Sequence, residues 1–97
     1  MPTYETCTHF THDWKHLTPV QRRRFTRVVR EAFVPGLRAG RLFRPGLRVK
    51  GVRAAAGVYE LTWAPDGRAT FTYGREHRNG CHIIWRRIGT HDILHRP

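Results

Sequence analysis

The chain has 97 residues, and its 18 lysines and arginines outnumber its 7 aspartates and glutamates to give a formal net charge of +11. A chain of this length is expected to form one domain, residues 1–97, around a thin core. The absence of serine excludes serine nucleophiles, and no apolar run approaches the roughly 20 residues that cross a bilayer.

The positive charge indicates a polyanionic or acidic partner, namely nucleic acid, the ribosome or an acidic protein. Sixteen of the basic residues are arginines, which favours bidentate contacts with phosphates. The only cysteines are Cys7 and Cys81, and no signal peptide precedes them. We therefore expect a cytoplasmic protein with reduced thiols and no membrane partner.

The first 17 residues predict a strand and a short helical turn. Residues 3–10, "TYETCTHF", alternate in polarity and are rich in residues that favour strands. Thr11 is a suitable cap for a helical turn that would place Phe10, Trp14 and Leu17 on one side.

The stretch "TPVQ" predicts the start of a helix, because Thr18 suits the N-cap, Pro19 the first turn and Gln21 a capping box. Helical spacing then gives an apolar side that would pack on a sheet and an opposite basic side. Pro35 and Gly36 are expected to break or bend the helix, and a short helical piece and a basic loop follow. The apolar side holds Phe25, Val28, Val29, Ala32 and Phe33, and the basic side holds Arg23, Arg27 and Arg30.

The clearest hairpin spans residues 58–74, where two alternating segments flank the turn "APDG". Its second face, with Glu60, Thr62, Thr70 and Thr72, is expected to be polar and open. A second turn is predicted at residues 74–80. The last strand, "CHIIWRRIG", is apolar on both faces and is expected in the sheet interior.

The order strand, helix, helix, strand, strand, strand predicts a small α+β domain. In it, an N-terminal strand and two helices precede a three-stranded antiparallel meander, within a mainly antiparallel sheet that the helices cover on one face. Trp63 and Trp85 alternate with apolar neighbours and are expected in the core rather than as platforms for bases.

The basic loop before "GVYELTW", the "DGR" turn before "ATFTYG" and the ending "IIWRRIGTHDIL" together resemble the RelE/ParE toxin superfamily of bacterial toxin–antitoxin systems. The resemblance covers nearly the whole chain. Its most specific part is the last strand followed by "IGTHDIL", which is similar to the "GTHSDLF" ending of toxins that cut messenger RNA on the ribosome.

This resemblance implies an endoribonuclease, an mRNA interferase, that needs no metal or other cofactor and inhibits translation in the ribosomal A site. An antitoxin encoded beside it, which we expect to be acidic, would silence it in a heterotetramer or larger complex. By position, His91 matches a catalytic histidine and Arg68 a transcript-binding arginine of the family. Lys50 precedes the second strand, where many members are basic.

Metal-independent cleavage requires a base near the 2′-hydroxyl, an acid near the leaving oxygen and cations around the phosphorane. Histidine suits either proton role and preorganised arginines suit the third. His91, Arg87, Arg86 and Arg68 would supply this set, with Asp92 orienting His91. Since neighbouring strand residues point to opposite faces, only one of Arg86 and Arg87 is expected to reach the open face.

The main RNA-binding stretch is expected in the basic loop, with Arg86 as a further contact. The helix arginines are expected to form a solvated face. A zinc site at Cys7, His9, His12 and His16 is disfavoured, because only His12 and His16 have the spacing of one helical face. The residues of the basic loop that are expected to bind RNA are Arg41, Arg44, Arg48, Lys50 and Arg53.

Two departures from the family keep other functions open. Members with a lysine-based site carry lysines where this chain has Glu60 and Thr62, and Leu94 replaces a frequent aromatic residue. The alternatives are a gyrase inhibitor of the ParE type, and a noncatalytic basic module that binds nucleic acid or an antitoxin. A shared fold does not decide among them.

Overall fold

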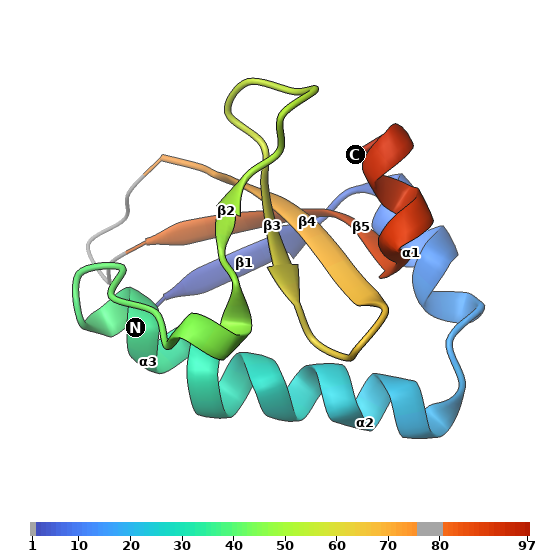
Figure 1. The fold of residues 1–97 in the computed structure, drawn as a ribbon, viewed down its shortest axis with the longest axis horizontal. Helices are drawn as coiled ribbons and strands as arrows, with labels where there is room; N and C mark the ends of the chain where they lie inside the picture. The colour runs from blue at the N-terminus through green and yellow to red at the C-terminus, as the bar shows by residue number, and fades with distance from the viewer. Residues whose placement is uncertain (1, 76–80) are drawn as a thin grey trace.

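The computed structural model describes residues 2–75 and 81–97, which form an α+β domain built on a five-stranded sheet (Figure 1). The strands lie in the order β1-β5-β4-β3-β2. Their bounds are β1 Thr3–Thr6, β2 Lys50–Gly51, β3 Tyr59–Thr62, β4 Gly67–Tyr73 and β5 His82–Thr90. The helical segments are α1 Thr8–Lys15, α2 Pro19–Val28, η1 Val29–Phe33, α3 Val34–Arg38, η2 Pro45–Leu47 and η3 His91–His95.

The sheet confirms the predicted mainly antiparallel arrangement. β5 lies between β1 and β4, pairing with β1 in parallel and with β4 in antiparallel register, so its prediction as an interior strand was correct. β3 and β4 form the predicted hairpin, with Tyr59 opposite Phe71 and Leu61 opposite Ala69. The two-residue strand β2 was not predicted, because a stretch this short carries no periodic signal.

The N-terminal prediction was only half right. The strand ends at Thr6, and α1 begins at Thr8 after Cys7. Thr11 therefore lies inside the helix, where its hydroxyl donates to the Cys7 carbonyl instead of capping a new turn. The early start of α1 places Phe10 in the core with Trp14 packed beside it, and this burial outweighs the strand preference of the local sequence.

The second helix begins as predicted, with Thr18 and Gln21 forming a reciprocal capping box. Pro35 does not end the helical backbone, which continues through it to Arg38, and the short helical piece predicted in this region is α3. One π-type turn, η1, precedes the proline, and the Val34 amide reaches back to the Val29 carbonyl. This wider turn accommodates a proline ring that an uninterrupted α-helix would exclude.

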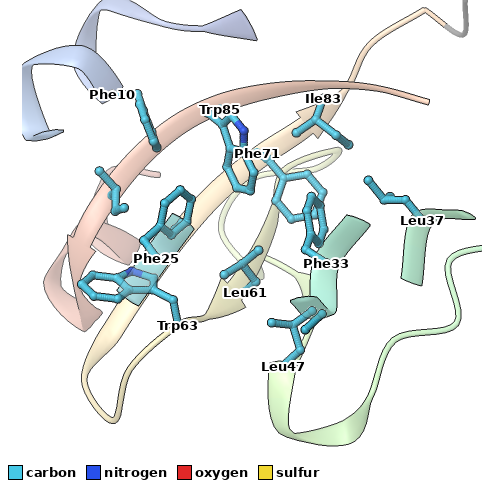
Figure 2. Close-up of a cluster of buried hydrophobic side chains, with 13 residues drawn as sticks. Phe10, Phe25, Phe33, Leu37, Leu47, Leu61, Trp63, Phe71, Ile83 and Trp85 are labelled. Atoms are coloured by element: carbon cyan, nitrogen blue, oxygen red, sulfur yellow. The ribbon is translucent and has the colours of Figure 1, made fainter. Parts of the chain in front are cut away.

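The core lies between the sheet and the helices and is built largely of aromatic rings (Figure 2). Phe33 is 1% exposed and contacts Phe43, Phe71 and Trp85, with ring centroids 5.0 to 5.4 Å apart. Trp63 and Trp85 are both buried, as the sequence predicted. Stacked and tilted ring pairs of this kind stabilise a core beyond their buried area.

The opposite face of the hairpin is less open than predicted. Glu60 and Thr70 on this face are buried. The loop between β2 and β3 and the C-terminal η3 both lie on this side of the sheet, whereas α2 lies on the other (Figure 1). Thr70 donates a hydrogen bond to the main-chain oxygen of Pro97, so the chain's own last residue covers part of the face.

The predicted turn at residues 74–80 lies largely outside the described residues, which resume at residue 81. Among the helices that the structure describes, none combines the length and apolar character needed to span a bilayer.

Phe33→Ala is expected to lower the free energy of unfolding by about 3–5 kcal/mol, because it removes contacts with several rings and leaves a cavity. Urea denaturation followed by circular dichroism measures the change. Val20→Ala in α2 is the control, because Val20 is 65% exposed and its truncation should cost less than about 0.5 kcal/mol. Equal losses for the two variants would contradict this account of the core.

Candidate active site and basic surface

A partly buried ion pair joins α1 to β5. The Asp13 carboxylate accepts from Arg87 Nε at 2.6 Å and Nη2 at 3.2 Å, and from the Ile88 amide at 3.1 Å. The Asp13 side chain is 14% exposed and the Arg87 side chain 25%. Arg87 Nη1 also donates to the Arg96 carbonyl at 2.9 Å. Arg87 therefore ties together α1, β5 and the C-terminal segment.

A β-bulge changes the positions of the two adjacent arginines. Thr70 pairs with Arg87 whereas Phe71 pairs with Trp85, which leaves Arg86 without a partner residue in β4. The expectation that only one of the two arginines reaches this face was wrong, because a bulge suspends the two-residue alternation of a strand. Arg86 Nε donates to the Pro97 main-chain oxygen at 3.1 Å, so both arginines hold the C-terminal segment.

His91 is exposed at the start of η3. Gly89 lies within β5, which continues to Thr90, so it does not form a turn. A Cβ atom at Gly89 would meet Ile93 Cγ2 at 3.0 Å, so the glycine makes room for η3 to pack on the strand. Thr90 caps η3 by accepting from the Asp92 amide at 3.4 Å.

Arg68 and His91 lie at the same end of the β4–β5 ladder. Arg68 pairs with Gly89, and Gly67 pairs with Thr90. The Arg68 guanidinium is held by the carbonyls of Pro65 and Gly67. Asp92 is exposed beside His91, and no hydrogen bond between their side chains occurs in the described structure. This end of the sheet therefore presents an accessible imidazole near a guanidinium that the hairpin turn fixes.

The predicted RNA-binding loop passes around the β2 edge of the sheet instead of forming one flat surface. Arg41 stacks on the Tyr73 ring at 3.8 Å, on the side of the helices. Lys50 reaches buried Glu60 at 4.0 Å on the opposite side. Burial raises the pKa of the Tyr73 phenol, and the Arg41 guanidinium opposes that shift. The other predicted loop residues, Arg44, Arg48 and Arg53, are exposed.

Several helix arginines serve the fold. Arg22 donates to the carbonyls of Trp14 and Lys15 at the end of α1, and Arg24 donates to the Trp63 carbonyl. Arg23, Arg27 and Arg30 are exposed, as the sequence predicted.

The histidines of α1 are close to one another without forming a metal centre. The His12 and His16 rings lie 4.8 Å apart, and His16 Nδ1 lies 3.0 Å from the His12 carbonyl. No group of three or more histidine, cysteine, aspartate or glutamate side chains that could hold a metal ion occurs among residues 2–75 and 81–97.

Two cavities lie on opposite sides of the sheet. An apolar groove of about 740 Å³ runs between β1, α1 and α2, where Phe10, Phe25 and Trp85 form its floor and Arg30 and Arg38 lie along it. A smaller cavity of about 340 Å³ is lined by residues from the start of α1, from β5 and from the C-terminal segment.

Sequence reasoning missed Asp13 as the partner of Arg87. The available signal was its helical spacing, since Asp13 follows Phe10 by three residues and so lies near the side of α1 that faces the core. A carboxylate at such a position requires a buried partner. Nothing in the sequence indicated which of the 16 arginines that partner would be.

No protein-family model matches this sequence, and no curated protein sequence matches it. Several solved structures are similar. A chain of the Escherichia coli DinJ-YafQ toxin-antitoxin complex aligns with a TM-score of 0.63 over 96% of both chains, at 12% identity. A copper-bound mutant toxin from Helicobacter pylori gives a TM-score of 0.62 over 97% of this chain and 99% of that chain, at 18% identity.

The Helicobacter pylori protein HP0892 aligns with a TM-score of 0.58 over 97% of this chain and 99% of that chain, at 20% identity. At these identities the likeness is one of fold. The chain therefore has the RelE-like toxin fold, which confirms the fold class predicted from the sequence.

Asp13→Asn is expected to lower the free energy of unfolding by about 1–3 kcal/mol, because it removes the charge from partly buried hydrogen bonds. Urea denaturation measures the loss. Glu31→Gln is the matched control, since its ion pair with Arg30 is exposed and should contribute less than about 1 kcal/mol. A loss no larger than in the control would show that the Asp13 contacts contribute little.

Proposed function

We propose that this protein is the toxin of a type II toxin–antitoxin system and cuts messenger RNA on the ribosome without a metal. The observation that carries the proposal is the exposed imidazole of His91 at the end of a RelE-like sheet, at the same end as Arg68. The strongly positive chain suits both the ribosome and a polyanionic substrate. Both partners occur in the cytoplasm, where we propose that the protein acts.

In the proposed reaction, the 2′-hydroxyl attacks the adjacent phosphorus and the 5′-oxygen leaves, giving a 2′,3′-cyclic phosphate. His91 moves one of the two protons, either from the attacking hydroxyl or to the leaving oxygen. Arg68 stabilises the charge that develops on the phosphorane. Because the nucleophile is the 2′-hydroxyl, DNA is not a substrate.

Arg86 and Arg87 act mainly as positioning residues in this proposal. The three nitrogens of Arg87 already donate to Asp13 and to the Arg96 carbonyl. Through these bonds Arg87 holds the segment that follows η3, and so it fixes where His91 lies.

Of the two residues at the lysine positions of other members, Glu60 is buried and Thr62 has no titratable side chain. Glu60 is buried against Lys50, so β3 offers neither a base nor an acid to the substrate. This observation supports a site centred on His91. The gyrase inhibitor and the noncatalytic module remain as outcomes of the test below.

His91→Gln should slow cleavage of a ribosome-bound message by about a hundredfold or more, because glutamine cannot move the proton. Ribosome binding should be nearly unchanged. Cut sites are measured by primer extension, and ribosome binding by co-sedimentation. His12→Gln is the control, since His12 is exposed on α1.

A His91→Gln protein that still cuts at the wild-type rate would remove His91 from the mechanism. If the wild-type protein halts replication with DNA damage and leaves transcripts intact, the gyrase inhibitor replaces the nuclease. If it leaves both transcripts and replication intact, the noncatalytic module is the better description.

We further propose that an acidic antitoxin docks through the apolar groove between β1, α1 and α2. The groove gives apolar side chains a floor of Phe10, Phe25 and Trp85, and its two arginines suit acidic residues at the edge of the partner segment. Tyr4 projects at this groove with 71% of its surface exposed. Such a segment would fold on binding.

Tyr4→Glu should weaken antitoxin binding about tenfold or more, because it places a charge within the apolar contact and opposes the acidic partner. Calorimetry with the product of the adjacent gene measures the affinity. Leu42→Glu is the control of equal charge, since Leu42 is 77% exposed and does not line the groove. Equal weakening in both variants would place the antitoxin elsewhere, and the absence of any binding partner would contradict the proposal.

A further inference from the structure

The smaller cavity has a chemistry that the proposed cleavage does not use. It lies where the start of α1, the loop before β3 and the C-terminal segment meet, and it has a volume of about 340 Å³. Three arginines line it, and none of its lining residues is acidic. Asp13, behind the lining, is ion-paired with Arg87, so Arg86 and Arg96 are the two lining arginines without a carboxylate partner among the described residues. Its lining includes Arg86, Arg87 and Arg96 with Cys7, His9 and Pro97.

Two of these arginines have donors that the fold leaves available. Arg86 uses only Nε, on the Pro97 oxygen, so both Nη groups remain for a ligand. The Arg96 guanidinium is exposed and makes no hydrogen bond or ion pair within the described part of the chain. The main chain of Arg96 is nevertheless fixed, because its carbonyl accepts from Arg87.

The first turn of α1 adds to the positive potential of this cavity. Cys7 precedes the helix with an extended backbone and gives it no side-chain cap, and no acidic residue occurs in the first turn. The amides at this end therefore meet no side-chain acceptor, and their partial positive charge reinforces that of the arginines. A compact anion with several acceptor oxygens matches this combination of forked and single donors.

We propose that this cavity is a phosphate subsite that binds a phosphodiester group of the RNA strand, away from the bond that is cut. The inference rests on the proposed function. Arg87 and His91 are four residues apart along β5 and its end, a separation of roughly 13 Å in extended chain. The cavity therefore holds a phosphate further along the RNA strand. It contributes to RNA binding and to the position of the RNA on the protein, and it takes no part in proton transfer.

The test uses a fluorescent 2′-deoxy oligonucleotide, which cannot be cleaved by the proposed route, so binding is measured without turnover. Arg96→Gln should weaken binding about three- to tenfold and reduce the dependence of log K on log salt concentration by about one phosphate contact. Arg23→Gln is the matched control, because it removes the same charge from an exposed position on α2. It should change affinity far less.

A titration with inorganic phosphate, followed by NMR, tests whether the cavity binds free phosphate or a phosphodiester of the nucleic acid. We expect shifts at the amides of Thr8, His9 and Arg96 in the wild-type protein and their loss in Arg96→Gln. Equal effects of Arg96→Gln and Arg23→Gln on oligonucleotide binding would overturn the subsite. So would a phosphate response with no effect of Arg96→Gln on the oligonucleotide, since the cavity would then bind only the free anion.

The proposal of the phosphate subsite and the proposal of the nuclease can be disproved independently. If the wild-type protein cuts no transcript but oligonucleotide binding still depends on Arg96, the subsite stands as a nucleic-acid contact and the nuclease falls. If cleavage is present and Arg96→Gln behaves as Arg23→Gln does, only the subsite falls. Because the exposed Arg96 side chain makes no hydrogen bond or ion pair within the described part of the chain, urea denaturation should give the same stability for Arg96→Gln as for the wild type.

Discussion

The Asp13 carboxylate is the contact on which the arrangement of the candidate site depends. It accepts from two Arg87 nitrogens and from the Ile88 amide while only 14% of its side chain remains exposed. Removing one partner of such a group leaves the other charged and poorly solvated. Arg87 also donates to the Arg96 carbonyl, so it holds the C-terminal segment as well. Asp13 and its partner Arg87 thus hold α1, β5 and the C-terminal segment in fixed positions relative to one another.

The high arginine content has two separate uses. Some guanidinium groups satisfy carbonyls that would otherwise lack partners, as Arg22 does at the end of α1 and Arg24 does beside Trp63. Others, such as Arg23 and Arg96, are exposed, and their side chains make no hydrogen bond or ion pair among the described residues. Both groups contribute to the positive field that attracts polyanions, but only the second has all of its donors available for direct contact with a partner. Net charge alone therefore overstates the surface available to a partner.

The candidate site and the apolar groove lie on opposite faces of the sheet. η3 lies on the side of the β2–β3 loop and α2 on the other side (Figure 1). His91 is the first residue of η3, whereas residues of α2 line the groove. A partner anchored in the groove must extend around the β1 edge to cover His91. This geometry favours a long segment that folds on the surface over a compact globular inhibitor.

The sequence by itself determined the elements whose signals are local. The capping box at Thr18, the alternation of β3 and β4 and the apolar run of β5 each specify one element through neighbouring residues. The resemblance to RelE-like toxins placed His91 and Arg68 near a common site, and the ladder puts them at the same end. Their catalytic roles remain predictions.

Only the tertiary structure decided the features that depend on residues distant in sequence. The pairing of Asp13 with Arg87 spans 74 positions, and any of many arginines could have satisfied that carboxylate. The bulge at Arg86 is a property of the pairing between β4 and β5, and the residues of β5 alone fit a regular strand equally well. Gly89 suggested a turn by its residue type, yet its role is to admit Ile93. Local propensity describes a backbone, whereas burial and charge pairing require knowledge of what lies opposite.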